Sequence, residues 1–188
     1  MIKFFCLCSI LFATNVSVAF GLELSELLVD ISKTSEKFSR FTETRTSHFL
    51  SKPLVSKGNL EFKAPAILVK QLTYPEKSEQ RINGDMLTII NNDSSTQTFS
   101  LSTYPELEIG INAIRWVLSG DIVNLKKSFD VIFKEYKQLW QLHLKPKNID
   151  IITKIKNITL IGKGTNITTV NIVHSSGDLV IMDLHDHH

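Results

Sequence analysis

Carboxylates and histidines are the side chains of this sequence that could carry out acid–base or metal chemistry. Two carboxylates act as a catalytic pair only where the chain sets them against each other. Here they fall in predicted turns or on polar strand faces, with no such spacing: Glu43, Glu61, Asp85 and Asp178. His48 is typical of a strand end, and no serine or cysteine nucleophile motif accompanies a histidine. The sequence therefore predicts no catalytic residues and no enzymatic activity.

Metal and cofactor sites are not predicted either. The only cysteines, Cys6 and Cys8, lie in the first residues of the chain, and no phosphate-binding glycine motif is present. The histidines of the last four residues, 185–188, have no fixed geometry around a metal, and we expect this tail to be disordered.

The N-terminal 19 residues have the pattern of a secretory signal peptide. Lys3 precedes an apolar run from Phe4 to Phe12, which is shorter than the about 20 residues that span a bilayer. Small residues at the −3 and −1 positions, Ser17 and Ala19, fit a cleavage site after Ala19. We therefore expect a periplasmic protein without disulfides, with one folded domain over residues 20–184.

Short alternating strands dominate that domain. Between Pro53 and Ile90 three or four strands follow one another, and Asn83-Gly84 between two apolar runs predicts a tight hairpin. Further strands are predicted at 38–49, 96–103, 129–134, 140–145, 155–161, 167–174 and 179–184. No strand–helix–strand alternation occurs, so a parallel nucleotide-binding sheet is excluded.

Three helices interrupt the strands. Helical spacing of apolar residues predicts one from Leu22 to about Phe38 and one over Glu106–Ser119, and Asp121 caps a shorter one to Ser128. The fold class is therefore mainly β with α: an unclosed antiparallel half-barrel of ten to eleven strands, covered by the N-terminal helix and by inserted lid helices.

The concave side of such a sheet must be filled by side chains, helices or a ligand. Each apolar residue alone is typical of ordinary core, but together they predict a cavity under a lid. The candidate lining residues are Phe41, Leu60, Phe62, Leu87, Ile89, Ile111, Ile114, Trp116, Phe133 and Trp140.

Lysines are concentrated in one part of a nearly neutral chain. Between Asp121 and Gly164 nine lysines stand against four acidic residues, whereas the whole chain has a net charge of +2. That balance does not favour nucleic acid as a partner. The lysines form either a solvated surface or a patch that docks transiently on an anionic membrane or an acidic partner, through Lys126, Lys127, Lys134 and Lys137.

Several short motifs follow one another along the chain. In the first half they are Phe38-Ser-Arg-Phe-Thr-Glu, Gly58-Asn-Leu-Glu-Phe62 with Pro65, Tyr74-Pro75, and Gly84-Asp85 with Leu87. In this order they resemble the periplasmic outer-membrane lipoprotein carrier family (LolA-like). The second half is similar to the branch associated with acyltransferase and glycolipid gene clusters, through Ile114-Arg-Trp-Val-Leu-Ser-Gly-Asp121, Trp140-x-Leu-x-Leu with Pro146, and Gly177-Asp178.

The resemblance implies a monomeric carrier that takes an acylated lipid or lipoprotein from an inner-membrane donor to an outer-membrane acceptor. One position departs from the family pattern. Lipoprotein-carrying members have an arginine before the proline of the second strand, where it latches the lid, and this chain has Ala64. The departure favours a lipid or lipid-linked product as cargo. The alternative function is a non-enzymatic envelope interaction or scaffold protein with a filled core.

Overall fold

The computed structural model describes residues 23–186, and the predicted signal peptide lies outside them. Eleven strands form one antiparallel sheet in the order β6-β5-β4-β3-β2-β1-β11-β10-β9-β8-β7. The strands are β1 (Glu36–Thr46), β2 (Leu54–Lys63), β3 (Ile67–Tyr74), β4 (Ser78–Asn83), β5 (Met86–Ile90), β6 (Thr96–Ser100), β7 (Phe129–Tyr136), β8 (Leu139–Pro146), β9 (Ile155–Lys163), β10 (Asn166–His174) and β11 (Leu179–Asp186). The predicted fold class is confirmed.

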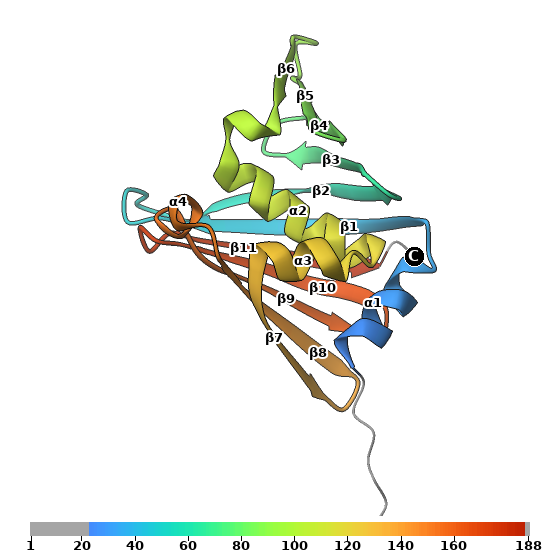
Figure 1. The fold of residues 1–188 in the computed structure, drawn as a ribbon. Coiled ribbons are helices and arrows are strands. Elements are labelled where there is room, and N and C mark those ends of the chain that lie inside the picture. The colour runs from blue at the N-terminus through green and yellow to red at the C-terminus, as the bar shows by residue number, and fades with distance from the viewer. Residues whose placement is uncertain (1–22, 187–188) are drawn as a thin grey trace, which may run out of the picture.

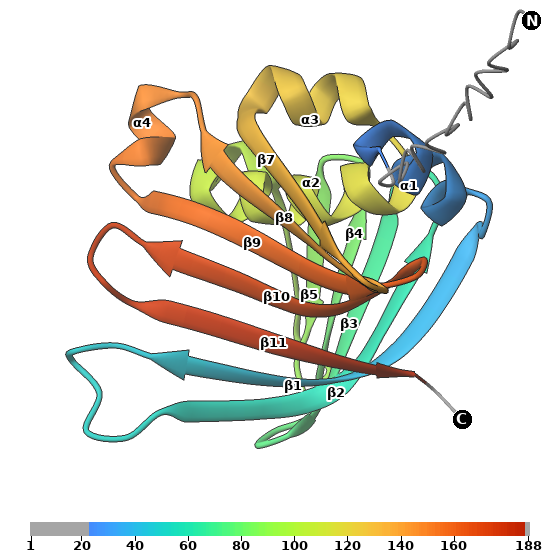
Figure 2. The ribbon, with the colours of Figure 1, turned by 90° about the horizontal axis from the view of Figure 1, so that it is seen from below.

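The sheet curves into an unclosed half-barrel, and the helices lie on its concave side (Figures 1 and 2). They are α1 (Leu24–Ser32), the 3-10 turn η1 (Leu101–Thr103), α2 (Pro105–Ser119), α3 (Ile122–Ser128) and α4 (Ile149–Ile152). Two meanders, β1–β6 and β7–β11, meet at the pairing of β1 with β11.

The first helix is shorter than predicted. It ends at Ser32, and the segment from Glu36 onward is strand, although helical spacing led us to expect helix to about Phe38. Thr34 and Ser35 favour non-helical backbone, and Glu36 and Phe38 pair with Lys63 and Glu61 of β2. Pairing with a neighbouring strand therefore overrides the helical pattern.

Two strand ends also differ from the prediction. The strand expected over 96–103 stops at Ser100, because the Ser100 hydroxyl accepts from the Ser102 amide and opens a 3-10 turn. At the other end of the chain, β11 continues through His185 and Asp186, where β1 provides pairing partners. Two residues of the tail that we expected to be disordered are thus strand, and residues 187–188 lie outside the described chain.

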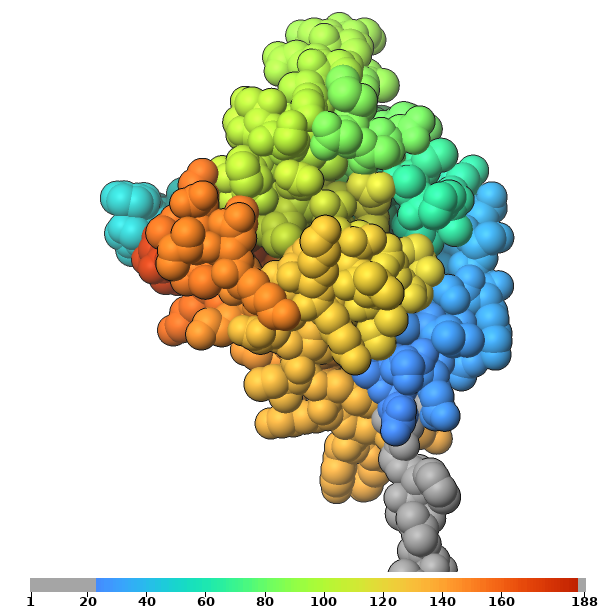
Figure 3. All heavy atoms as spheres, viewed as in Figure 1, coloured from blue at the N-terminus to red at the C-terminus, as the bar shows by residue number. Residues whose placement is uncertain are grey.

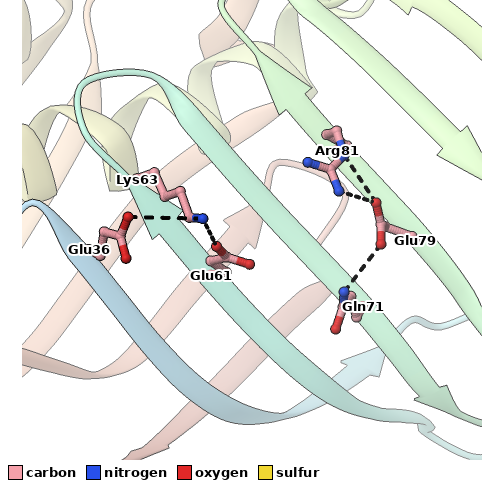
Figure 4. A network of polar contacts seen from close by, with 6 residues as sticks. All are labelled: Glu36, Glu61, Lys63, Gln71, Glu79 and Arg81. Carbon is pink, nitrogen blue, oxygen red and sulfur yellow. Dashed lines mark hydrogen bonds and ion pairs between the residues drawn. The ribbon is translucent and has the colours of Figure 1, made fainter.

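Alternation separates an apolar concave face from a polar convex face. Phe41, Leu60 and Phe62 point inward and are buried. On the convex face, six side chains of β1–β4 form the ion pairs and hydrogen bonds that Figure 4 shows: Glu36, Glu61, Lys63, Gln71, Glu79 and Arg81. The Glu61 carboxylate raises the pKa of Lys63, its closest partner at 2.9 Å. Such exposed pairs are screened by solvent and contribute little to stability, so the apolar face carries the packing.

Candidate functional site

All ten predicted lining residues belong to one apolar cluster on the concave side. Seven are buried, while Ile89, Trp116 and Phe133 are half-buried and pack against the others. The helices also contribute, because Leu28 and Ile31 of α1 are buried in the same cluster. The interior is therefore largely filled by side chains of the protein in this conformation, and whether these residues line a ligand site stays a prediction.

Trp140 is the most constrained of the ten. Its indole Nε1 donates a hydrogen bond to the Gly164 carbonyl at 2.8 Å. The ring also lies over Gly162, where an added Cβ would come within 2.1 Å of the indole. This geometry favours a structural role for Trp140 in the wall formed by β8 and β9.

One ion pair interrupts the apolar wall. Lys70 Nζ lies 2.6 Å from Glu43 Oε2, and the two side chains are only 16% and 13% exposed. Strand register puts both on the concave face, next to Phe41, whose ring centroid is 5.0 Å from the ammonium. The sequence predicted Glu43 in a turn or on a polar strand face, and that prediction is wrong, because Glu43 lies on the apolar concave face. The alternation of side chains along β1 could have predicted this position, because Phe41 and Glu43 point to the same side of the strand.

The lid helix α2 is held at its C-terminal half by an arginine. Arg115 Nη1 donates to the Gly84 carbonyl in the β4–β5 turn at 2.8 Å and to Asn112 Oδ1 at 3.3 Å. Ala64 occupies the position of the family's latch arginine, and its backbone amide donates to the Ser35 carbonyl at 2.8 Å. We had expected no polar latch at Ala64, and the structure has a polar latch that starts from the lid instead of the sheet.

A second contact holds the N-terminal end of α2. Lys154 Nζ donates to Glu106 Oε2 at 3.0 Å, across the gap between α2 and the segment that follows α4. The backbone amide of Glu106 and the Lys154 ammonium lower the pKa of this carboxyl. Because Gly84 belongs to the first meander and Lys154 adjoins the second, α2 is tied to both halves of the sheet.

Two recesses flank α2. One, of about 240 Å³, lies beside its C-terminal half and includes Leu60, Ile114, Leu118 and Ile167. The other, of about 370 Å³, lies between α2 and the β8–α4 segment and includes Ile109, Trp116 and Ile151. Figure 3 shows a hollow at this second position, between orange α4 and the green and yellow atoms of α2 and α3. A recess therefore lies on each side of α2.

The structure separates the four predicted docking lysines into two pairs. Lys126 and Lys127 are exposed on α3, where β7 begins, whereas Lys134 and Lys137 lie toward the opposite end of β7 and its turn into β8. The second pair accompanies Tyr136 and Leu139, which are 72% and 51% exposed. The four residues do not form one patch.

Two histidines of the described chain make polar side-chain contacts outside the apolar cluster. His48 Nδ1 lies 3.4 Å from Asp178 Oδ1, and His143 Nδ1 lies 3.1 Å from Thr159 Oγ1. A hydrogen bond from the Ser47 hydroxyl lowers the pKa of Asp178. Within residues 23–186 no three histidine, cysteine or acidic side chains are grouped as metal ligands, and no helix is long and apolar enough to cross a membrane.

Fold and site together define an antiparallel half-barrel with a helical lid latched over an apolar concave face. A family model described as outer membrane lipoprotein carrier protein LolA-like matches residues 17–184, and the chain belongs to this family. Among curated proteins none matches the sequence.

Solved structures with a similar arrangement are distant in sequence. A LolA superfamily protein from Nitrosomonas europaea aligns with a TM-score of 0.47 and 10% identity over 88% of this chain and 93% of that one. A putative outer membrane lipoprotein-sorting protein domain from Vibrio parahaemolyticus aligns with a TM-score of 0.43 and 6% identity over 87% and 89%. The MucA/MucB complex of Pseudomonas aeruginosa aligns with a TM-score of 0.48 and 10% identity over 87% of this chain and 56% of that one.

Proposed function

We propose that this protein is a periplasmic carrier that encloses the acyl chains of a lipid, a lipid-linked product or a lipoprotein and moves them toward the outer membrane. The observation that carries the proposal is the construction of α2. Its apolar side fills the concave face, and only a few polar contacts tie it to the sheet, at Arg115 and Glu106. Membership of a family described by lipoprotein carriage supports the same function.

Energetics favour exchange of lid side chains for an acyl chain. Each methylene group moved out of water contributes roughly 0.8 kcal/mol. A hydrogen bond to a charged group contributes about 1.5–3 kcal/mol, so about four buried methylenes offset the loss of the Arg115 contact. The chain must in addition replace the contacts of α2 side chains that are buried in the closed form, such as Val117 and Leu118. We therefore expect the lid to open only when the chain takes their place on the concave face.

Lipid extraction from protein purified from the periplasm tests this function. We expect bound acyl lipid by native mass spectrometry, and less of it in Trp116→Asp, because the carboxylate opposes burial of a chain beside α2. Phe49→Asp is the matched control, since Phe49 is 83% exposed in the β1–β2 loop. Delipidated wild-type protein that takes up no lipid from the envelope fraction would contradict the proposal.

The filled interior supports a second candidate, an envelope interaction protein with no lipid cargo. Val117 and Ala113 of α2 are both 0% exposed, as expected of permanent core. This candidate predicts that purified protein contains no lipid and that Trp116→Asp affects stability alone. The two candidates also differ in their partners. Only the carrier needs a donor protein at the inner membrane and an acceptor protein at the outer membrane.

A further inference from the structure

The groove between α2 and the β8–α4 segment, called the α2–α4 groove below, has an apolar floor. Ile109 and Trp116 contribute to it from α2, and Pro146 and Ile151 from the opposite wall. Its volume of about 370 Å³ is at the lower end of the range for small-molecule sites, about 300–1,000 Å³. That space suits one chain better than a lipid with several.

The helical period of α2 explains why this groove exists. Pro105, Ile109, Asn112 and Trp116 follow one face of the helix, whereas Ala113 and Val117 turn into the core. Ile109 and Trp116 stay half-buried because the groove separates them from the opposite wall. An apolar helix face is thus left partly open beside the packed interior.

Trp116 stands at the inner boundary of the groove. Its ring meets that of Phe129 edge to face, with centroids 6.3 Å apart, and Phe129 is only 1% exposed. A chain that lies along the groove would reach the core by displacing the Trp116 ring from Phe129.

Positive charge borders this apolar floor. Lys127 and Lys147 line the groove, and Glu108 is its only acidic lining residue. Burial lowers the pKa of the nearby Arg115, whereas the negative charge of Glu108 raises it, and the positive charge of Arg115 offsets that of Glu108. Lys147 is engaged by the Lys126 carbonyl at 2.6 Å and lies 3.8 Å from Asp130, whereas Lys127 makes no ion pair with any residue in the range 23–186. Lys127 is therefore placed to meet an anion.

We propose that the α2–α4 groove is the entry port of the carrier for a single-chain amphiphile with an anionic head group. The chain lies against Ile109 and Trp116, and the head is held by Lys127, with Lys147 beside it. This inference rests on the proposed carrier function and adds to it the charge of the cargo and its route into the interior.

The test compares two probes of equal chain length, dodecanoate and dodecan-1-ol, by titration below their solubility limits. Lys127→Glu is expected to weaken dodecanoate binding about three- to tenfold, from the loss of an exposed charge pair and the gain of a repulsion. It should change dodecanol binding less than about twofold. Lys77→Glu, the same charge change at an exposed site in the β3–β4 turn, should alter neither.

The possible results separate the port from the carrier function. If both probes bind the wild type and Lys127→Glu behaves like Lys77→Glu, the port is wrong and the carrier stands. An equal loss for both probes would show that Lys127 acts on the shape of the groove, which also overturns the assignment. If neither probe binds the wild type, the port for a single-chain amphiphile is wrong, and lipid extraction decides separately on the carrier function.

A brominated dodecanoate locates the bound chain. Bromine quenches nearby tryptophan, so fluorescence quenching should occur in the wild type and be lost in Trp116→Phe, where only the buried Trp140 still emits. Equal quenching in both proteins would place the chain away from the α2–α4 groove and contradict the proposal.

Discussion

Arg115 is the only basic residue of α2, and it lies where the helix passes the β4–β5 turn. Burial lowers its pKa, and the charges of Asp85 and Glu108 act in the opposite direction. The guanidinium stays charged, because an arginine pKa lies far above neutral pH. Because Arg115 is half-buried and donates to the Gly84 carbonyl of the β4–β5 turn, it forms a contact between the lid and the sheet.

We predict that Arg115→Ala loosens the lid. Loss of a charged hydrogen bond should lower the free energy of unfolding by about 1–3 kcal/mol and should speed hydrogen exchange in α2 more than in the central strands. Urea unfolding and amide exchange measure the two effects. Arg81→Ala is the matched control, because Arg81 pairs with Glu79 on the exposed convex face. Equal effects of the two variants would show that Arg115 is not a latch.

The Glu43–Lys70 pair makes a second prediction at this scale. Lys70→Met leaves the Glu43 carboxylate without its cation on the apolar face, and we expect a loss of about 1–3 kcal/mol in the free energy of unfolding. Glu43→Leu combined with Lys70→Met should recover most of that loss, because no unpaired charge remains. Chemical unfolding of the three proteins is the measurement. A double variant less stable than Lys70→Met would show that the charges themselves stabilise the wall.

Sequence reasoning predicted apolar residues of the site better than polar ones. Phe62 and Leu87 were found by alternation, which reports the face of a strand directly. The role of Arg115 was missed, although the motif that contains it was recognised. Its acceptor is a backbone carbonyl 31 residues away, and no side-chain pattern marks such a partner.

At the scale of elements, turns and periodicity determined most boundaries. The Asn83-Gly84 hairpin was predicted correctly, and Gly84 has the positive φ of 59° that such a turn requires. The pairing of β1 with β11 was not predicted, because nothing local to either strand identifies a partner so distant in sequence. The same limitation explains why the end of α1 was placed too late.

The N-terminal contact of α2 predicts a pH dependence. The folded-state pKa of Glu106 is lowered, so its stabilising contribution is present above the ordinary value of about 4.5 and is lost as the pH falls through the folded-state value. Because the Glu106 side chain is 34% exposed, we expect less than about 1 kcal/mol. Glu106→Gln should therefore be less stable than the wild type at pH 7 and nearly equal to it at pH 3. A constant difference across thermal unfolding scans at several pH values would contradict this.

At the scale of the whole molecule, the two lysine pairs have different surroundings. Lys127 adjoins the α2–α4 groove, whereas Lys134 and Lys137 share the projecting end of the β7–β8 hairpin with Tyr136 and Leu139. Exposed aromatic, apolar and basic side chains together are typical of contact with an anionic membrane surface. We therefore propose transient membrane docking at the hairpin, apart from the cargo site proposed at the groove.

Charge reversal of each pair tests that division. Lys134→Glu with Lys137→Glu should reduce flotation with vesicles that contain anionic lipid. We expect the free energy of membrane binding to weaken by roughly 1 kcal/mol for each lysine. Lys126→Glu with Lys127→Glu should retain vesicle association. Flotation on uncharged vesicles provides the baseline. If the second double variant loses as much association as the first, docking is not confined to the hairpin.

The position of β1 in the middle of the sheet has a consequence for synthesis. A chain made from its N-terminus can build β1–β6 early, but the free edge of β1 waits for β11, whose partners reach from Thr46 back to Ser39. Until then a long edge strand is open to pairing with other chains, which is a common origin of aggregation. For the interval in which the two halves of the sheet have not yet met, the chain therefore exposes an unpaired edge that only its last strand closes.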